Sequence, residues 1–385
     1  MAPGSPEASE ERLYTIHARV TVATMCVEDA KRHIHALSPR VDATATMFLE
    51  IEDPRSESEV GSIQVTFRQV YWLCKLLESK IGVTTSHVVF CVDENRSSSA
   101  ISGCCTLVGA YLLLIHQTKL DEVDAIFAPL LEHLTHHQAG WCSSDSAIIK
   151  DCWRALETVK GLGWLSEWYP RNVTSRTPPC IDMNEFLCYD DPCNGGFHAI
   201  IPGRLFVFNC PTDLPEDPNS VEILPGMDVD GERLFDGSFY ANLWPDLDIA
   251  LVVQCCGDDE YDASKFKDFD IPVEQMNVND GGKSWLLQHF DRFLTLARLA
   301  PGALAIHGDR TGLGLAEALI CSLLMREYHF DAKAAVAWIS MVHPPKHVAW
   351  LLFSQPDASA TCQLWKHLLD GADLPDREVP DLNRS

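Results

Sequence analysis

Residues 305–324 read AIHGDRTGLGLAEALICSLL and place a glycine-rich turn between an apolar strand and an apolar helix. Gly312 and Gly314 permit tight turns and a close approach of the backbone to a ligand. The N–H groups in the first turn of a helix attract anions, because they have no partner within the helix. The stretch therefore predicts an α/β unit whose loop can hold a phosphate group on backbone amides.

The length and composition bound the fold and the compartment. A chain of 385 residues predicts two domains, because a single hydrophobic core rarely grows so large. No apolar run is long enough to span a bilayer, and residues 1–14 lack the basic and apolar regions of a secretory signal. We therefore expect a cytoplasmic or nuclear protein.

The charge is strongly acidic, with 30 Lys and Arg against 55 Asp and Glu and a net charge of −25. Such a chain repels nucleic acid and anionic membranes, so we expect neither as a partner. The charge favours basic partners, or it serves solubility alone.

Fifteen cysteines in a cytoplasmic or nuclear protein are expected to stay reduced. No CxxC pair occurs together with a second such pair or with a pair of histidines, so the spacing predicts no zinc site, and we expect no metal and no cofactor. The adjacent cysteines at 104–105 and 255–256 lie in apolar contexts and are interpreted as buried small hydrophobes.

Two stretches of the chain show the same order of elements, which is a strand, a loop, a helix and a short helix. The residues concerned are 86–92, 101–117 and 119–130 in the first stretch, and 302–308, 316–329 and 329–340 in the second. This order favours two copies of one α/β unit, the alternative being two unrelated strand–turn–helix units.

Further strands are expected at 199–211, 246–254 and 271–279, and an amphipathic helix at 284–300. Strands that alternate with helices indicate mostly parallel central sheets flanked by helices. The expected division of the chain is a disordered segment at 1–12, an N-terminal domain at 13–168, a linker at 169–196, a C-terminal domain at 197–356 and a polar tail at 357–385.

Several segments resemble, in the same order, the cell-division-cycle-fourteen family of dual-specificity protein phosphatases. They are VVFCVDENR, LVGAYLLL, IIPGRLFVF, VNDGG and AIHGDRTGLGLAEALICSLLMREYHFDAKAAVAWISMVHP. The resemblance implies two tandem domains with the cysteine-phosphatase fold, of which only the second is catalytic. It also implies protein substrates with phosphoserine followed by proline and a basic residue, and roles in mitotic exit, at centrosomes or at cilia.

The mechanism that the resemblance implies needs a cysteine thiolate that attacks phosphorus, an arginine that clamps the phosphoryl oxygens and an aspartic acid that protonates the leaving oxygen. In this sequence Gly308 stands at the nucleophile position, Leu315 at the arginine position and Ala316 at the position of the assisting Ser or Thr. Glycine has no side chain that could form a covalent intermediate, so we expect the catalytic machinery to be lost.

Other family positions are kept in part. Asp280 in VNDGG matches the general acid and is interpreted as vestigial, the alternative being an ordinary turn aspartate. Asp190 and Asp191 match the acidic groove that recognises the basic residue of the substrate. The predicted phosphate loop comprises His307, Gly308, Asp309, Arg310, Thr311, Gly312, Leu313 and Gly314.

These observations favour a pseudophosphatase that binds phosphorylated or basic protein segments. One alternative is an active protein phosphatase that uses Asp280 and Arg310 in place of the lost residues. Another is a purely structural subunit whose cleft stays empty.

Overall fold

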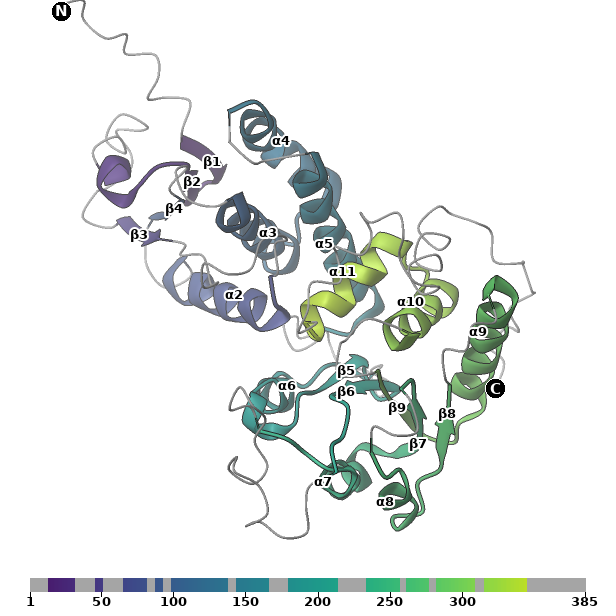
Figure 1. Cartoon of the computed structure of the whole chain (residues 1–385). Coiled ribbons are helices and arrows are strands. Elements are labelled where there is room, and N and C mark those ends of the chain that lie inside the picture. The colour runs from purple at the N-terminus through teal and green to yellow at the C-terminus, as the bar shows by residue number, and fades with distance from the viewer. Residues whose placement is uncertain are drawn as a thin grey trace, which may run out of the picture.

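The computed structural model describes eleven ranges of the chain, from residue 13 to residue 344 (Figure 1). They are 13–31, 46–50, 65–81, 87–92, 98–137, 143–165, 179–213, 233–256, 261–276, 282–308 and 315–344. Helices and strands of these ranges form two α/β halves, each around one sheet. The expected fold class, with mostly parallel sheets flanked by helices, is confirmed.

The first half contains a four-stranded sheet and four long helices. Its strands are β1 (Leu13–His17), β2 (Val20–Ala23), β3 (Thr46–Glu50) and β4 (His87–Cys91). Its helices are α2 (Phe67–Ile81), α3 (Ser98–Leu114), α4 (Leu120–His137) and α5 (Ser143–Leu162). Helix α4 runs seven residues beyond the short helix expected at 119–130, and α5 lies in a region where no helix was expected.

The second half contains a five-stranded sheet. Its strands are β5 (Phe197–Ile201), β6 (Leu205–Phe208), β7 (Ile249–Gln254), β8 (Val273–Gln275) and β9 (Ala303–His307). Its α-helices are α6 (Met183–Tyr189), α7 (Gly237–Leu243), α8 (Ser264–Lys267), α9 (Gly282–Leu299), α10 (Leu315–Tyr328) and α11 (Ala332–Val342). Two short 3₁₀ helices, η5 (Pro192–Asn194) and η6 (Trp244–Leu247), complete it.

The two sheets share one arrangement. In the first the strand order is β1-β2-β4-β3, and in the second it is β5-β6-β9-β7-β8. Each sheet begins with an antiparallel hairpin, which is β1–β2 in the first sheet and β5–β6 in the second. The strand that precedes the apolar helix, β4 or β9, pairs in parallel with the second strand of that hairpin. Strands β4 and β9 therefore occupy equivalent positions, as the repeated order of elements predicts.

The expected linker at 169–196 contains regular structure in its described part. Asp182 begins α6 by accepting hydrogen bonds from the backbone N–H groups of Asn184 and Glu185, at 2.8 and 3.1 Å. Phe186 on this helix is buried and packs against the ring of Phe67 in α2. Residues 179–196 are therefore a packed part of the molecule and not a free connection.

A single hydrophobic core joins the two halves, and Trp338 of α11 lies where they meet. Its side chain is fully buried. The centroid of its ring lies 5.3 Å from that of Phe67 and 6.2 Å from that of Trp164, and both of these residues belong to the first half. The indole N–H donates a hydrogen bond to the carbonyl oxygen of Ile200 in β5, at 3.0 Å. One side chain thus contacts α2, the end of α5 and the second sheet.

We expect Trp338→Ala to lower the free energy of unfolding by about 3–5 kcal/mol, because it leaves a cavity and an unpaired carbonyl at the junction of the halves. Chemical denaturation followed by fluorescence and circular dichroism measures this loss. The matched control is Trp72→Ala, since Trp72 is 54% exposed, and it should change stability by less than about 0.5 kcal/mol. Equal effects of the two substitutions would contradict the shared core.

Candidate functional site

The candidate site lies at the carboxyl ends of β6, β9 and β7, which run parallel and adjacent in the second sheet (Figure 1). Ligand sites of α/β proteins form at such edges. His307 ends β9, Gly308 follows it, and Leu315 begins α10. The rest of the predicted phosphate loop, Asp309 to Gly314, and the predicted acid Asp280 lie outside the described residues.

His307 is fully buried and is held on both ring nitrogens. Its Nδ1 atom lies 3.0 Å from the carbonyl oxygen of Gly308, and its Nε2 atom lies 2.9 Å from the hydroxyl of Tyr261. A carbonyl only accepts, so Nδ1 carries the proton and Nε2 accepts the hydroxyl proton of Tyr261. Burial raises the pKa of Tyr261, which keeps this hydroxyl protonated. These contacts are those of a histidine packed inside the fold.

The position of the missing nucleophile has room for a side chain. Among the residues that the structure describes, a Cβ atom on Gly308 would meet only the Cβ atom of Ala316, at 3.6 Å, which is an ordinary van der Waals distance. The described neighbours of Gly308 therefore leave space for the first atom of a side chain. Glycine at this place is not required by crowding.

At the arginine position, by contrast, the side chain that is present is buried in the core. Leu315 is 2% exposed and belongs to the core that joins the two halves, and Ala316 beside it is fully buried. A guanidinium at this place would lose its hydration without gaining a partner among apolar side chains. The helix has thus become part of the core where the resemblance implies a phosphate clamp.

Asp190, expected to recognise a basic substrate residue, already has basic partners within the chain. Its carboxylate lies 3.0 Å from the guanidinium of Arg68 in α2 and 3.1 Å from Nε2 of His198 in β5. The other ring nitrogen of His198 lies 3.1 Å from Nδ1 of His343, just beyond α11. Asp191, the second expected groove residue, accepts a hydrogen bond from the N–H of Cys193 and begins η5.

The environment of Asp190 favours its charged form. Burial alone would raise the pKa of this carboxyl, but the hydrogen bond and charge of His198, followed by those of Arg68, outweigh it and hold the pKa below its usual range. Asp190 therefore acts as an internal link between the two halves.

Three residues that are far apart in the sequence lie close together at the carboxyl ends of β6, β7 and β9. The ligand atoms of Cys210, Cys256 and His307 all lie within 4.8 Å of one another. Cys210 follows β6 by two residues, Cys256 follows β7 by two residues, and His307 ends β9. The CxxC spacing in the sequence does not predict this cluster, because each member lies at the end of a different strand. The one sequence feature that could have indicated it is a polar or thiol residue at or just after the end of each apolar strand.

The adjacent cysteines at 255–256 behave differently from one another. Cys255 is fully buried, and burial raises its pKa well above the usual value, as expected of a small hydrophobe. The hydrogen bond from Cys210 is the largest of the effects that lower the pKa of Cys256 to about 5, burial opposes it, and His307 adds to the lowering. Both cysteines are buried, as expected, but Cys256 also interacts with Cys210 and His307.

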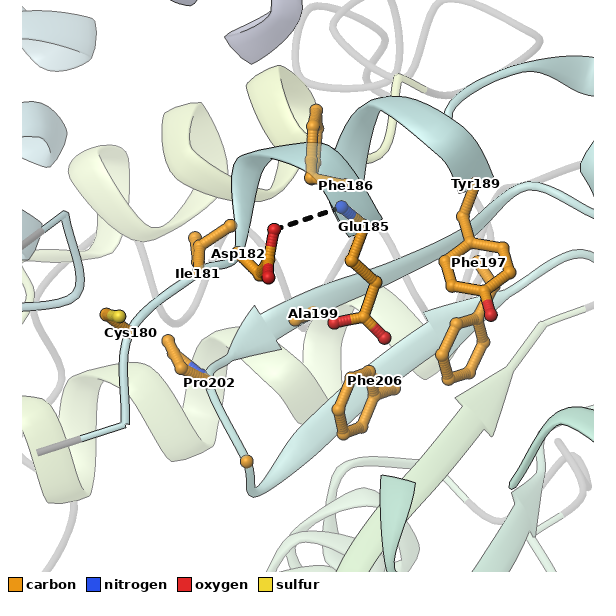
Figure 2. A pocket seen from close by; sticks show the side chains of 11 residues that line it. Cys180, Ile181, Asp182, Glu185, Phe186, Tyr189, Phe197, Ala199, Pro202 and Phe206 are labelled. Atoms are coloured by element: carbon orange, nitrogen blue, oxygen red, sulfur yellow. Dashed lines mark hydrogen bonds between the residues drawn. The ribbon is translucent and has the colours of Figure 1, made fainter. Parts of the chain in front are cut away.

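A separate pocket of about 60 Å³ lies between α6 and the β5–β6 hairpin (Figure 2). Figure 2 shows the carboxylate of Glu185 directed toward the hairpin, near Ala199 and Phe206. Burial, and next the charge of Asp182, raise the pKa of Glu185. The volume is that of about two water molecules, which is too small for a phosphorylated side chain.

The sequence is similar to curated phosphatases of one kind. It is 29% identical over 257 residues to the dual specificity protein phosphatase CDC14AB of Danio rerio, and 26% identical over 284 residues to CDC14A of Homo sapiens. These matches cover 66% and 71% of this chain. The chain is thus similar to the CDC14 phosphatases and diverges widely from them. It spans only 37% of the first of these CDC14 proteins and 43% of the second.

No family profile matches the chain. Among solved structures, the active form of Tk-PTP covers 46% of the chain with 14% identity and a TM-score of 0.31. A protein tyrosine phosphatase from Leishmania major covers 43% with 17% identity and a TM-score of 0.28. Within the described ranges of this CDC14-like chain, no helix combines the length and the apolar character needed to cross a membrane.

We expect Gly308→Cys to leave stability nearly unchanged, whereas Leu315→Arg should lower the free energy of unfolding by at least about 3 kcal/mol, because it buries an unpaired charge. Thermal and chemical denaturation measure both changes. Leu299→Arg is the matched control, since Leu299 is 76% exposed and should tolerate the same substitution. If Leu315→Arg were as harmless as Leu299→Arg, the assignment of Leu315 to the core would be wrong.

The depressed pKa of Asp190 predicts a pH-dependent contribution to stability. Its stabilisation is complete well above the unfolded pKa of about 3.9 and is lost as the pH falls through the lower folded value. We expect Asp190→Asn to cost about 1–3 kcal/mol at pH 7, and we expect this cost to decrease as the pH falls below the unfolded pKa of about 3.9.

Denaturant titrations of wild type and variant from pH 7 to pH 3 measure this difference. Asp268→Asn, at an exposed aspartate, should show no such pH dependence. A cost for Asp190→Asn that stays constant down to pH 3 would contradict the ionised bridge.

Proposed function

We propose that this CDC14-like chain is a pseudophosphatase that binds phosphorylated or basic protein segments without hydrolysing them. The observation that carries the proposal is Gly308, which directly follows β9 where the resemblance calls for the attacking thiol. Without a thiolate there, no cysteinyl-phosphate can form, and the covalent route is closed.

The neighbouring residues support the loss of chemistry. Leu315 and Ala316 are apolar and buried, so they supply neither the clamp nor the assisting hydroxyl that the resemblance calls for. Removing a fixed cation from a phosphoryl-transfer site removes several kcal/mol of transition-state stabilisation, and losses of cooperating groups are not additive. His307 is already hydrogen-bonded on both ring nitrogens.

Two properties of the chain support binding. Its net charge of −25 favours basic segments, and the glycine-rich loop retains backbone amides that can receive an oxyanion. We infer a phosphoprotein or a basic protein segment as the partner, and the cytoplasm or nucleus, including centrosomes and cilia, as the place of action. The partner and the place rest on the family resemblance and on the charge.

The test combines turnover with binding. A phosphoserine–proline peptide with a following basic residue should release no inorganic phosphate above background, while an active CDC14 phosphatase does so in the same assay. Fluorescence anisotropy should detect binding of the same labelled peptide. The affinity should fall at least about tenfold in Arg310→Ala, because a cation contacts the phosphate, and stay unchanged in Arg326→Ala at the far end of α10.

Each outcome separates the three hypotheses. Phosphate release that Asp280→Ala abolishes would show an active enzyme with displaced chemistry. Absence of both turnover and binding, for phosphorylated and for basic peptides, would leave a structural subunit.

A further inference from the structure

The phosphatase resemblance gives no role to Cys210 or Cys256 and places His307 only at the start of the predicted phosphate loop. Together these residues offer three side chains of the kinds that bind metal ions. Two thiols and an imidazole are the donor set that soft or borderline cations prefer, and Mg²⁺ and Ca²⁺ avoid it in favour of oxygen. Whether one ion can contact all three depends on their placement.

The backbone fixes the three residues on one rigid platform. The sheet order β6-β9-β7 puts the strand of His307 between the strands that precede the two cysteines. His307 is paired with Gln254 in the parallel ladder, and the N–H of Cys255 donates to the carbonyl oxygen of His307, at 3.0 Å. The relative positions of Cys256 and His307 are thus set by strand pairing and not by a loose loop.

The separations suit a tetrahedral ion. The three ligand atoms lie within 4.8 Å of one another. Bond lengths of about 2.3 Å to sulfur and about 2.0 Å to nitrogen place the ligand atoms of tetrahedral Zn²⁺ roughly 3.5–3.8 Å apart. Side-chain rotations of the cysteines close the remaining difference.

The surroundings of His307 prepare one ring nitrogen for coordination. Its Nδ1–H donates to the carbonyl oxygen of Gly308, which leaves the lone pair on Nε2. Histidines that bind metals are oriented by such a second hydrogen bond. The hydroxyl of Tyr261 donates to this lone pair at 2.9 Å and also lies 3.4 Å from the amide oxygen of Gln254. An ion would replace the hydrogen bond to Nε2, and the hydroxyl would keep Gln254 as a partner.

Two of the three residues of the cluster are buried and the third is partly exposed. His307 is fully buried, Cys256 is 5% exposed, and Cys210 is half-buried. An ion would therefore enter past Cys210 and lose most of its water. This loss is offset when the two thiols release their protons to solvent and bind as thiolates.

We propose that Cys210, Cys256 and His307 bind one Zn²⁺ ion through two thiolate sulfurs and one imidazole nitrogen. The fourth tetrahedral position is left for water or for another donor. The site links the ends of β6, β7 and β9, next to Gly308 in the sequence. The proposal does not depend on whether the chain hydrolyses or binds phosphorylated segments.

Cobalt is the spectroscopic probe of this site. Titration of the reduced full-length chain with Co²⁺ should give thiolate-to-metal charge-transfer absorption and tetrahedral d–d bands that saturate at one equivalent. One equivalent of Zn²⁺ should abolish them. Cys210→Ser and Cys256→Ser should each weaken binding at least about tenfold, whereas Cys188→Ser and Cys193→Ser, at exposed cysteines of the same half, should leave it unchanged.

Thermal denaturation gives a readout that also tests whether the variants fold. One equivalent of Zn²⁺ should raise the Tm of the wild type and of Cys193→Ser, because the ion binds the folded state. The same addition of Zn²⁺ should leave the Tm of a folded Cys210→Ser protein unchanged. Cys210→Ser is the preferred variant, because Cys210 is the least buried of the three residues.

Three results would overturn the proposal. They are the absence of Co²⁺ absorption in the reduced wild type, absorption that persists in both serine variants, and a Cys210–Cys256 disulfide that forms under reducing conditions and excludes the ion.

Discussion

Strand β9 is the element on which the second half and its site depend. All five of its residues are buried, and it pairs in parallel with β6 on one side and with β7 on the other. Burial on both faces of a parallel strand fixes both its register and its direction, because a slip of one residue would exchange every side chain between the faces. This constraint places His307 at the sheet edge and Gly308 directly after it. It also brings the ends of β6 and β7, with Cys210 and Cys256, to the same place.

The two positions that differ from the implied phosphatase machinery have different physical consequences. Among the described residues, Gly308 has space for a Cβ atom, so nothing described there excludes a side chain at this position. Leu315 has become part of the hydrophobic core, so the missing arginine has been replaced by apolar packing that a charge would disrupt. The loss of the clamp is therefore coupled to stability, whereas the loss of the nucleophile is not. A site that evolved in this way keeps the shape of the strand and helix without the groups that stabilise a transferring phosphoryl group.

The same coupling appears between the halves. Trp338 packs on residues of the first half and donates to the backbone of β5, and Asp190 bridges Arg68 of α2 and His198 of β5. Asp190 thus contributes to the junction between the halves, where the resemblance implies recognition of a basic residue. The buried tryptophan and the ionised bridge act on the same junction, one through apolar area and the other through charge. Their combination explains how a region expected to be a linker came to contain a helix with a buried phenylalanine.

The sequence by itself determined the α/β class, the repeated order of elements and the strand, turn and helix around Gly308, because these follow from local patterns of apolar residues and glycines. Through the resemblance it also predicted which catalytic residues are replaced. It did not reveal α6, the partners of Asp190 or the cluster of two cysteines and a histidine. Those depend on which strands and helices become neighbours, and residues such as Cys210, Cys256 and His307 meet only because the sheet order is β6-β9-β7. Contacts between residues that are distant along the chain leave no periodic signal, so only the tertiary structure decided them.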